Sequence, residues 1–204
     1  IWNSVEGERM WAQLRGYAVA RPETVRRMFG HGRILSSDWR QPENARDCLR
    51  LLTAKAARRL RREGYLASAL HVSIGTQDGM RWGGETTFFP ARDDHTFLRK
   101  ACEVYDAGIR ALEGRRLKKV SVMLHHISQP GEVSADLFEH ANKAAERSRW
   151  ERVTDAMDVL NSRNGGGVVS LGPRKEPPGG YAGAKIAFGR VPDLDDFLVV
   201  RTDR

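Results

Sequence analysis

The stretch from Leu70 to Phe89, LHVSIGTQDGMRWGGETTFF, predicts a β-hairpin near the middle of the chain. Apolar residues alternate with small or polar ones along its first half, which is the period of a strand with one buried face. Asp78-Gly79 follows, and this dipeptide favours a tight turn because both residues tolerate a positive φ. We expect Met80 to Phe89 to return as the partner strand, closed by Pro90.

A helix is predicted on each side of this hairpin. Gln41 to Glu63 and Asp94 to Leu112 both place apolar residues at three- and four-residue steps, which forms one apolar stripe on each helix. Beyond the helices, Arg26 to Ser36 and Lys119 to Ile127 predict two further strands. The order is βαββαβ, so we expect an α+β fold, a four-stranded sheet with both helices on one face.

Such an arrangement leaves the other face of the sheet open. The residues expected on it are small or polar in most cases: His71, Ser73, Gly75, Ser121, Met123 and His125. An open face of this kind suits a nucleic-acid backbone, because small side chains allow a close approach to the sheet.

The charge of the chain points to the same class of ligand. Its 34 Lys and Arg residues exceed its 26 Asp and Glu residues by a formal net charge of +8, and the segment from Arg26 to Arg62 alone carries +8. A concentrated positive charge attracts polyanions and releases counterions from phosphates, so nucleic acid is favoured over a merely solvated helix face. We expect no membrane partner, because no apolar run approaches the ~18 residues of a spanning helix.

The sequence holds no pattern that predicts catalysis or metal binding. His125 and His126 are adjacent on a predicted strand and should point to opposite faces, so they cannot bind one ion together. Asp93 or Asp94 is expected to cap the helix that follows rather than to act as a catalytic acid. The two cysteines are isolated and fit small core residues in a reducing, cytoplasmic compartment.

Several stretches resemble one known family. They are IWNSVEGERMWAQLRG (Ile1–Gly16), RRMFGHGRIL (Arg26–Leu35), and the tail MDVLNSRNGGGVV followed by AGAKIAFGRVPDLDDF. With the βαββαβ run, they resemble the C-terminal part of a Y-family translesion DNA polymerase of the UmuC-like, ImpB/MucB/SamB branch. The resemblance implies a thumb remnant and linker at 1–24, a little-finger DNA-binding domain at 25–130 and a C-terminal extension at 131–204.

In that family the little finger lays its sheet along the duplex and contacts mostly phosphates, so the resemblance implies sequence-independent binding to primer–template DNA. The residues implied as DNA-binding are Arg26, Arg27, Gly30, His31, Gly32, Arg33, Ser73, Arg81, Trp82, Thr86 and Thr87. Gly83, Gly84 and Glu85 stand where relatives often carry more basic residues. Trp82 also fits a core aromatic residue at the edge of the sheet.

The stretch from Ser134 to Phe138, SADLF, resembles the peptide with which this family binds its sliding clamp. The resemblance assigns Asp136, Leu137 and Phe138 to the clamp, and accessory mutasome proteins to the extension. An exposed Leu-Phe pair is a reasonable anchor for an apolar pocket. The alternative is that Leu137 and Phe138 staple the next helix to the core.

The family's catalytic carboxylates, which hold two Mg²⁺ ions, lie before the thumb and would precede Ile1. Since Ile1 is no initiator methionine, we expect a fragment that is inactive alone and holds no cofactor, from a parent DNA-directed DNA polymerase that serves SOS-type lesion bypass. The alternative is a stand-alone, ferredoxin-like nucleic-acid-binding module. A hydrolase using His31 or His95 lacks a matching nucleophile and base.

Overall fold

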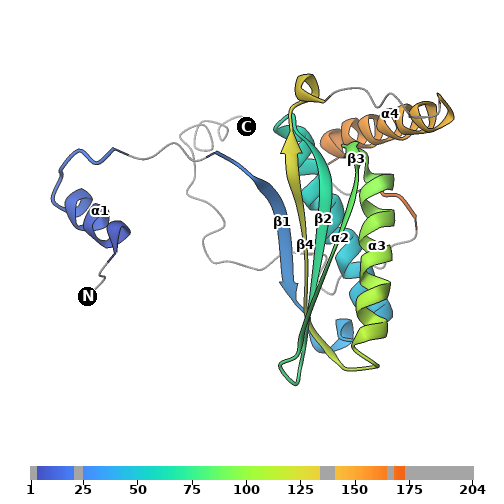
Figure 1. The fold of residues 1–204 in the computed structure, drawn as a ribbon, viewed down its shortest axis with the longest axis horizontal. Helices are drawn as coiled ribbons and strands as arrows, with labels where there is room; N and C mark the ends of the chain where they lie inside the picture. The colour runs from blue at the N-terminus through green and yellow to red at the C-terminus, as the bar shows by residue number, and fades with distance from the viewer. Residues whose placement is uncertain (1–3, 21–24, 134–140, 165–167, 173–204) are drawn as a thin grey trace, which may run out of the picture.

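The computed structural model describes residues 4–20, 25–133, 141–164 and 168–172. These ranges contain α1 (Val5–Leu14), β1 (Met28–Ile34), η1 (Ser37–Trp39), α2 (Pro42–Arg62), β2 (Leu66–Thr76), β3 (Arg81–Ala91), α3 (Asp94–Ala111), β4 (Leu117–Ser128), η2 (Pro130–Glu132) and α4 (Ala141–Arg163). The run from β1 to β4 confirms the predicted α+β fold with βαββαβ order (Figure 1). Within the described ranges, no helix has the length and apolar character needed to cross a bilayer.

The strands form one sheet in the order β1-β4-β2-β3. Every neighbouring pair is antiparallel, so β1 runs parallel to β2 with β4 between them, and β3 runs parallel to β4 with β2 between them. Each helix therefore crosses over one strand. As a result α2 packs on β1 and β4, α3 packs on β2 and β3, and both helices cover the same face (Figure 1).

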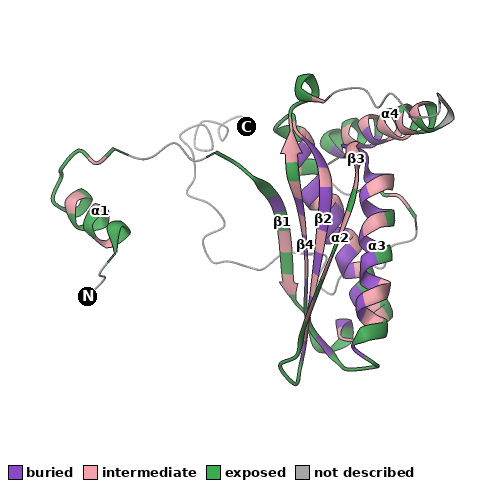
Figure 2. Cartoon of the chain, in the orientation of Figure 1, coloured by how far each residue is buried: buried purple, intermediate pink, exposed green. Residues whose placement is uncertain are grey.

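The core lies between this sheet and its two helices. Leu70, Val72 and Ile74 of β2 are completely buried, and the alternating residues of β4 join them, so the covered side of the sheet is the buried one in Figure 2. Each large apolar side chain buried in this way contributes about 1.5–3 kcal/mol to folding. The spacing that predicted the strands is thus the spacing that fills the core.

Trp82 belongs to the helix side of β3. A Cβ atom at Gly108 of α3 would lie 2.5 and 2.7 Å from carbons of the Trp82 ring and 2.8 Å from Ile74 Cδ1. A Cβ at Gly84 would also collide with the indole. The ring therefore fills the space of two absent side chains and packs against the core, which explains glycine at both positions.

Two sequence expectations about local structure are wrong. Pro90 does not close β3, which continues to Ala91; β3 is an edge strand, where proline is tolerated because no neighbour needs its missing N–H. The apolar residues of the stretch from Val168 to Leu171 predict a short strand, but the structure has bends at Val168, Val169 and Leu171 instead. There the Asn161 side chain takes the place of a strand partner, since it bonds both the N–H and the C=O of Val169 at 2.9 Å.

Polar contacts help to dock helix α4 on the domain. The guanidinium of Arg61, only 5% exposed, pairs with Asp94 at 2.7 Å and with Asp158 of α4 at 2.6 Å. The backbone N–H of Asp94 donates to Thr154 Oγ1, which is buried on α4. The predicted cap is confirmed at Asp93, whose side chain accepts from the N–H of Thr96. These contacts place α4 across the end of α2 and the start of α3.

Gly108→Ala should destabilise the domain, although glycine-to-alanine changes inside helices normally stabilise by roughly 0.5–1 kcal/mol. The new methyl group would overlap Trp82 and Ile74, and overpacking of this kind costs about 1–3 kcal/mol. Urea unfolding should show the loss. Gly131→Ala is the matched control, because a Cβ there meets nothing within 4 Å. A stabilised Gly108→Ala variant would contradict the described packing of Trp82.

Candidate nucleic-acid interface

The face of the sheet opposite α2 and α3 consists of aligned cross-strand rows. Strand alternation places the six residues expected there on this face, which confirms that part of the sequence analysis. In the order β1, β4, β2, β3, the rows are Met28–His125–Ala69–Thr87, Gly30–Met123–His71–Glu85, Gly32–Ser121–Ser73–Gly83 and Ile34–Lys119–Gly75–Arg81. We call this surface the open face.

In the middle of the open face, the side chains rise little above the backbone of the sheet because the residues there are glycine and serine. A Cβ at Gly32 would come within 3.0 Å of Ser121 Cβ, and a Cβ at Gly83 would come within 2.9 Å of His71 Nε2. These glycines therefore let Ser121 and His71 lie close to the sheet. A surface of this kind allows a bulky backbone to approach the strands without obstruction.

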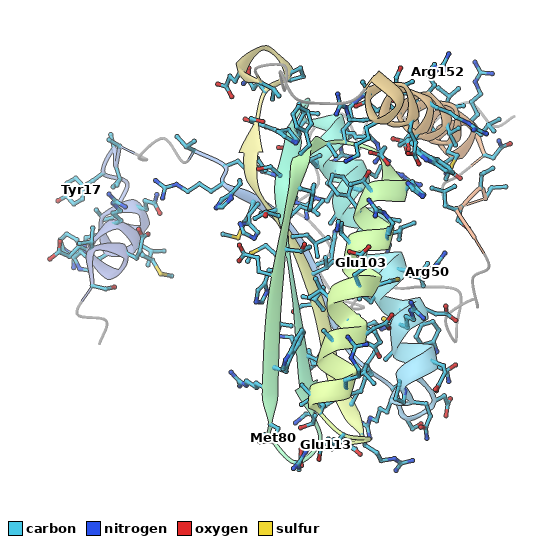
Figure 3. All side chains as sticks on the ribbon, turned by 45° about the vertical axis from the view of Figure 1, so that its right-hand side comes forward. Tyr17, Arg50, Met80, Glu103, Glu113 and Arg152 are labelled. Atoms are coloured by element: carbon cyan, nitrogen blue, oxygen red, sulfur yellow. The ribbon has the colours of Figure 1, made fainter. Side chains whose placement is uncertain are left out.

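The hairpin end of the open face carries positive charge. Arg81 and Lys119 flank Gly75 in the row next to the hairpin turn, which ends at Met80. Figure 3 shows Met80 at the end of the domain opposite Arg152 of α4. Arg26 and Arg27 precede β1 at the other end.

Sequence reasoning missed the cations at the start of β4. The run from Arg115 to Lys119 reads RRLKK, and all four of its basic residues are exposed. Arg115 pairs with Asp78 of the hairpin, which ties this basic run to the turn between β2 and β3. Four basic residues in five positions are a signal that the sequence itself carries, although the segment from Arg26 to Arg62 contains more basic residues in total.

Histidines gather at the opposite end of the open face. His125 Nε2 lies 3.5 Å from Glu85 Oε2 without a hydrogen bond, and His71 lies opposite Glu85 in the register. Burial lowers the pKa of His125 below its ordinary 6.5; Glu85 opposes this, whereas His126 and His71 add to it.

The backbone at His126 breaks the regular alternation of the strand. Its φ is +50°, and its ring meets that of His125 edge-on at 4.7 Å, although neighbours on a regular strand point apart. Across the residues that the structure describes, no group of three or more potential ligands could hold a metal ion.

The structure separates the proposed DNA-binding residues into two sides. Gly30, Gly32, Ser73, Arg81 and Thr87 lie on the open face, whereas His31, Arg33, Trp82 and Thr86 alternate with them and point to the helix side. Arg26 pairs with Glu63 at 2.7 Å and lies over the ring of Phe29. Arg27 is exposed before β1.

His31 and Arg33 meet a cationic flank of α2. Burial lowers the pKa of His31, and the nearby charges of Arg59 and Lys55 lower it further. The pKa of Lys55 is lowered by burial and then by Arg33 and Arg58. These causes place cationic side chains of α2 near His31 and Arg33, on the helix side of the edge strand β1 rather than on the open face.

The basic segment 26–62 therefore does not form one continuous strip. Arg46 pairs with Asp106 of α3 at 3.0 Å, and Arg58 lies 3.5 Å from Asp158 of α4, which also pairs with Arg61. A helix of 3.6 residues per turn distributes its charges around its circumference. The charge of α2 is consequently shared between α3, α4 and the β1 edge.

Residues 26–137 match the family model of the impB/mucB/samB family C-terminal domain, which is more than half of the chain. The chain belongs to the impB/mucB/samB family. This finding confirms the branch that the sequence motifs resemble, and it makes the βαββαβ unit the family's C-terminal, little-finger domain.

Solved structures with a similar arrangement come from Y-family polymerases. A complex of a beta-clamp processivity factor with the little finger domain of PolIV matches at 16% identity and a TM-score of 0.40, covering 55% of this chain and 99% of that one. An insertion ternary complex of Dbh DNA polymerase matches at 11% sequence identity and a TM-score of 0.45, covering 62% of this chain and 36% of that one. DinB from Sulfolobus solfataricus matches at 12% identity and a TM-score of 0.43, covering 48% of this chain and 28% of that one. The match thus spans about a third of the Dbh and DinB chains, and no curated protein matches this chain.

Stability should rise as the pH increases from about 5 to 7. His31 and His125 have lowered pKa values in the folded protein, so the unfolded chain binds more protons below the ordinary value of 6.5. Their contribution is fully present above that value and is lost as the pH falls below it. Urea unfolding at a series of pH values measures the slope. The His31→Gln/His125→Gln variant should have a flatter profile, and an unchanged slope would contradict this assignment.

Proposed function

We propose that this domain holds duplex DNA by its sugar–phosphate backbone, with the open face as the binding surface. The observation that carries the proposal is the arrangement of that face: a low centre of glycine and serine, with Arg81 and Lys119 at the hairpin end and Arg27 exposed before β1 at the other end. β1 spans seven residues between those ends, or about 20 Å at 3.3 Å per residue. That span exceeds the ~12 Å width of the major groove, so cations at both ends could reach phosphates on its two sides.

The chemistry of these groups favours backbone contacts over base contacts. Arginine presents forked donors that match phosphate oxygens, and exposed backbone at glycine allows a close approach. The serines and threonine of the face, Ser73, Ser121 and Thr87, add hydroxyl donors. Phosphate contacts position a protein without reading sequence, so binding should be independent of DNA sequence.

The domain would act as the DNA grip of a translesion polymerase in the cytoplasm, where it contributes to lesion bypass in an SOS-type response. Polymerisation itself, with Mg²⁺ held by palm carboxylates, would belong to the preceding domains of such a protein. Residues 1–24 would be the end of the thumb with a linker, residues 25–130 the little finger and residues 131–204 the extension. The ion pairs of Arg61 and Arg92 with Asp158 and Asp155 attach α4 of that extension to the little finger.

A sliding clamp is proposed as the second partner. Asp136, Leu137 and Phe138 lie outside the described residues, so the proposal depends on the resemblance of SADLF to the family's clamp peptide. A little finger domain in complex with a beta-clamp is known for PolIV. Accessory mutasome proteins would meet the remaining extension.

The variant Arg81→Ala/Lys119→Ala should weaken binding to a labelled primer–template by at least tenfold. It should also make the dependence of log Kd on log salt shallower by about two, since each lost phosphate contact reduces that slope by about one. Fluorescence anisotropy at several salt concentrations measures both quantities for two unrelated DNA sequences.

The matched control is Arg110→Ala/Arg152→Ala, which removes two exposed charges from the helix side. It should keep the salt slope and stay within about twofold of the parent affinity. Equal losses in the two double variants would show that only the net charge matters, and the open face would then be the wrong surface.

Leu137→Ala/Phe138→Ala should abolish capture of the domain by an immobilised beta-clamp and leave its melting temperature unchanged. Anchor residues of an interface contribute to binding but not to the fold of the free protein. Capture assays and thermal melting measure the two effects. A large drop in melting temperature would instead support the alternative, in which the pair staples α4 to the core.

A further inference from the structure

A cavity of about 480 Å³ lies where α4 crosses the end of β3 and the start of α3. Its walls combine aromatic rings with cations, and the residues used below are Phe89, His95, Arg99, Lys143, Arg147 and Trp150. Its volume lies within the range of ordinary small-molecule sites. Neither the family match nor the open face accounts for it.

One wall of the cavity is a preformed stack of rings. The imidazole of His95 on α3 and the indole of Trp150 on α4 are nearly parallel, at 6°, with centroids 4.0 Å apart. The guanidinium of Arg147 lies over the ring of Phe89, 4.4 Å from its centroid. Rings already held in place by neighbours lose little entropy when a further ring stacks on them.

An irregularity of β3 turns Phe89 toward this cavity. Ala67 of β2 pairs with Ala91 and Ala69 pairs with Thr87, so β3 has extra residues between these two pairs. Phe88 meets Phe97 with ring centroids 5.8 Å apart, and Phe88 and Phe89 both line the cavity, although neighbours on a regular strand point to opposite sides. Bulges at sheet edges commonly redirect a side chain in this way.

Positive charge predominates around the rings. Arg99, Lys143 and Arg147 line the cavity, and Glu146 is the acidic residue in its lining. Arg99 also lies 3.6 Å from Glu103 on its own helix, and its side chain is 55% exposed. Aromatic faces that lie next to cations match a ligand made of flat rings and phosphates.

We propose that this cavity takes a nucleotide from a single-stranded segment of the DNA that the domain holds. The base would extend the His95–Trp150 stack, and its phosphates would lie near Lys143 and Arg147. Phe89 lies two residues after Thr87, which ends a row of the open face, so a strand that leaves the duplex at this end would pass the cavity. The inference rests on the proposed function in one respect, namely that the ligand is DNA.

The test titrates the domain against a short labelled oligo(dT) and, in parallel, against a blunt duplex. Lys143→Glu and Phe89→Leu should each weaken oligo(dT) binding by roughly tenfold, as expected for the loss of a stacked or neutralised nucleotide, and should leave duplex affinity within about twofold. Arg149→Glu is the matched control, because Arg149 is exposed on the same helix but does not line the cavity. Circular dichroism melting verifies that each variant is folded.

Three results would overturn the inference. Equal weakening by Lys143→Glu and Arg149→Glu would show a general charge effect, and unchanged oligo(dT) binding in both cavity variants would show that the cavity is not used. Competition by free dTMP as effective as that by oligo(dT) would show a mononucleotide site instead of a strand site. The duplex titration tests the proposed function separately. Absence of duplex binding would overturn the proposal for the open face, whereas unchanged oligo(dT) binding in the cavity variants, with normal duplex binding, would overturn only the proposal for the cavity.

Discussion

The central position of β4 is the constraint on which the rest of the structure depends. Although β4 is the last strand of the domain in sequence, it pairs with β1 on one side and β2 on the other. Each helical connection must then cross one intervening strand, and both α2 and α3 reach the same face. The apolar residues of β2 and β4 are buried beneath them. The opposite face carries the small and polar residues, so the candidate binding surface is a consequence of strand order.

Ion pairs determine where the positive charge of this basic chain is directed. Arg46 forms an ion pair with Asp106 of α3, and Arg61 forms one with Asp158 of α4. The guanidinium of Arg61 is largely removed from water, which costs much of what its attraction to Asp158 returns, so this pair orients α4 more than it strengthens the fold. The further effect of these ion pairs is that the open face depends on Arg81 and Lys119, which come from the hairpin and β4 rather than from the basic helix.

The surface that results changes in character along the strands. Cations beside the hairpin and before β1 suit phosphates, and the low glycine and serine centre suits close approach. At the α4 end, His95 of α3 and Trp150 of α4 add stacked rings. Duplex and single-stranded DNA both present phosphates, but only the single strand presents unstacked bases. The two proposed sites match this difference, and α4 of the extension contributes only to the second.

The sequence by itself determined the type and order of the elements, because the two-residue period of Leu70 to Ile74 and the three- and four-residue steps of α2 are local properties. It also indicated the family and the cap at Asp93. For β2 and β4 the sequence also indicated which residues face away from the helices, but for β1 the side that each residue faces was decided only by the tertiary structure. Alternation says that His31 and Arg33 lie opposite Gly30 and Gly32, but which set is covered depends on where the helices cross. The ion-pair partners of the basic residues could not be inferred from the sequence either. Arg61 and Asp158 are 97 residues apart, and they meet only because α4 folds back across α2.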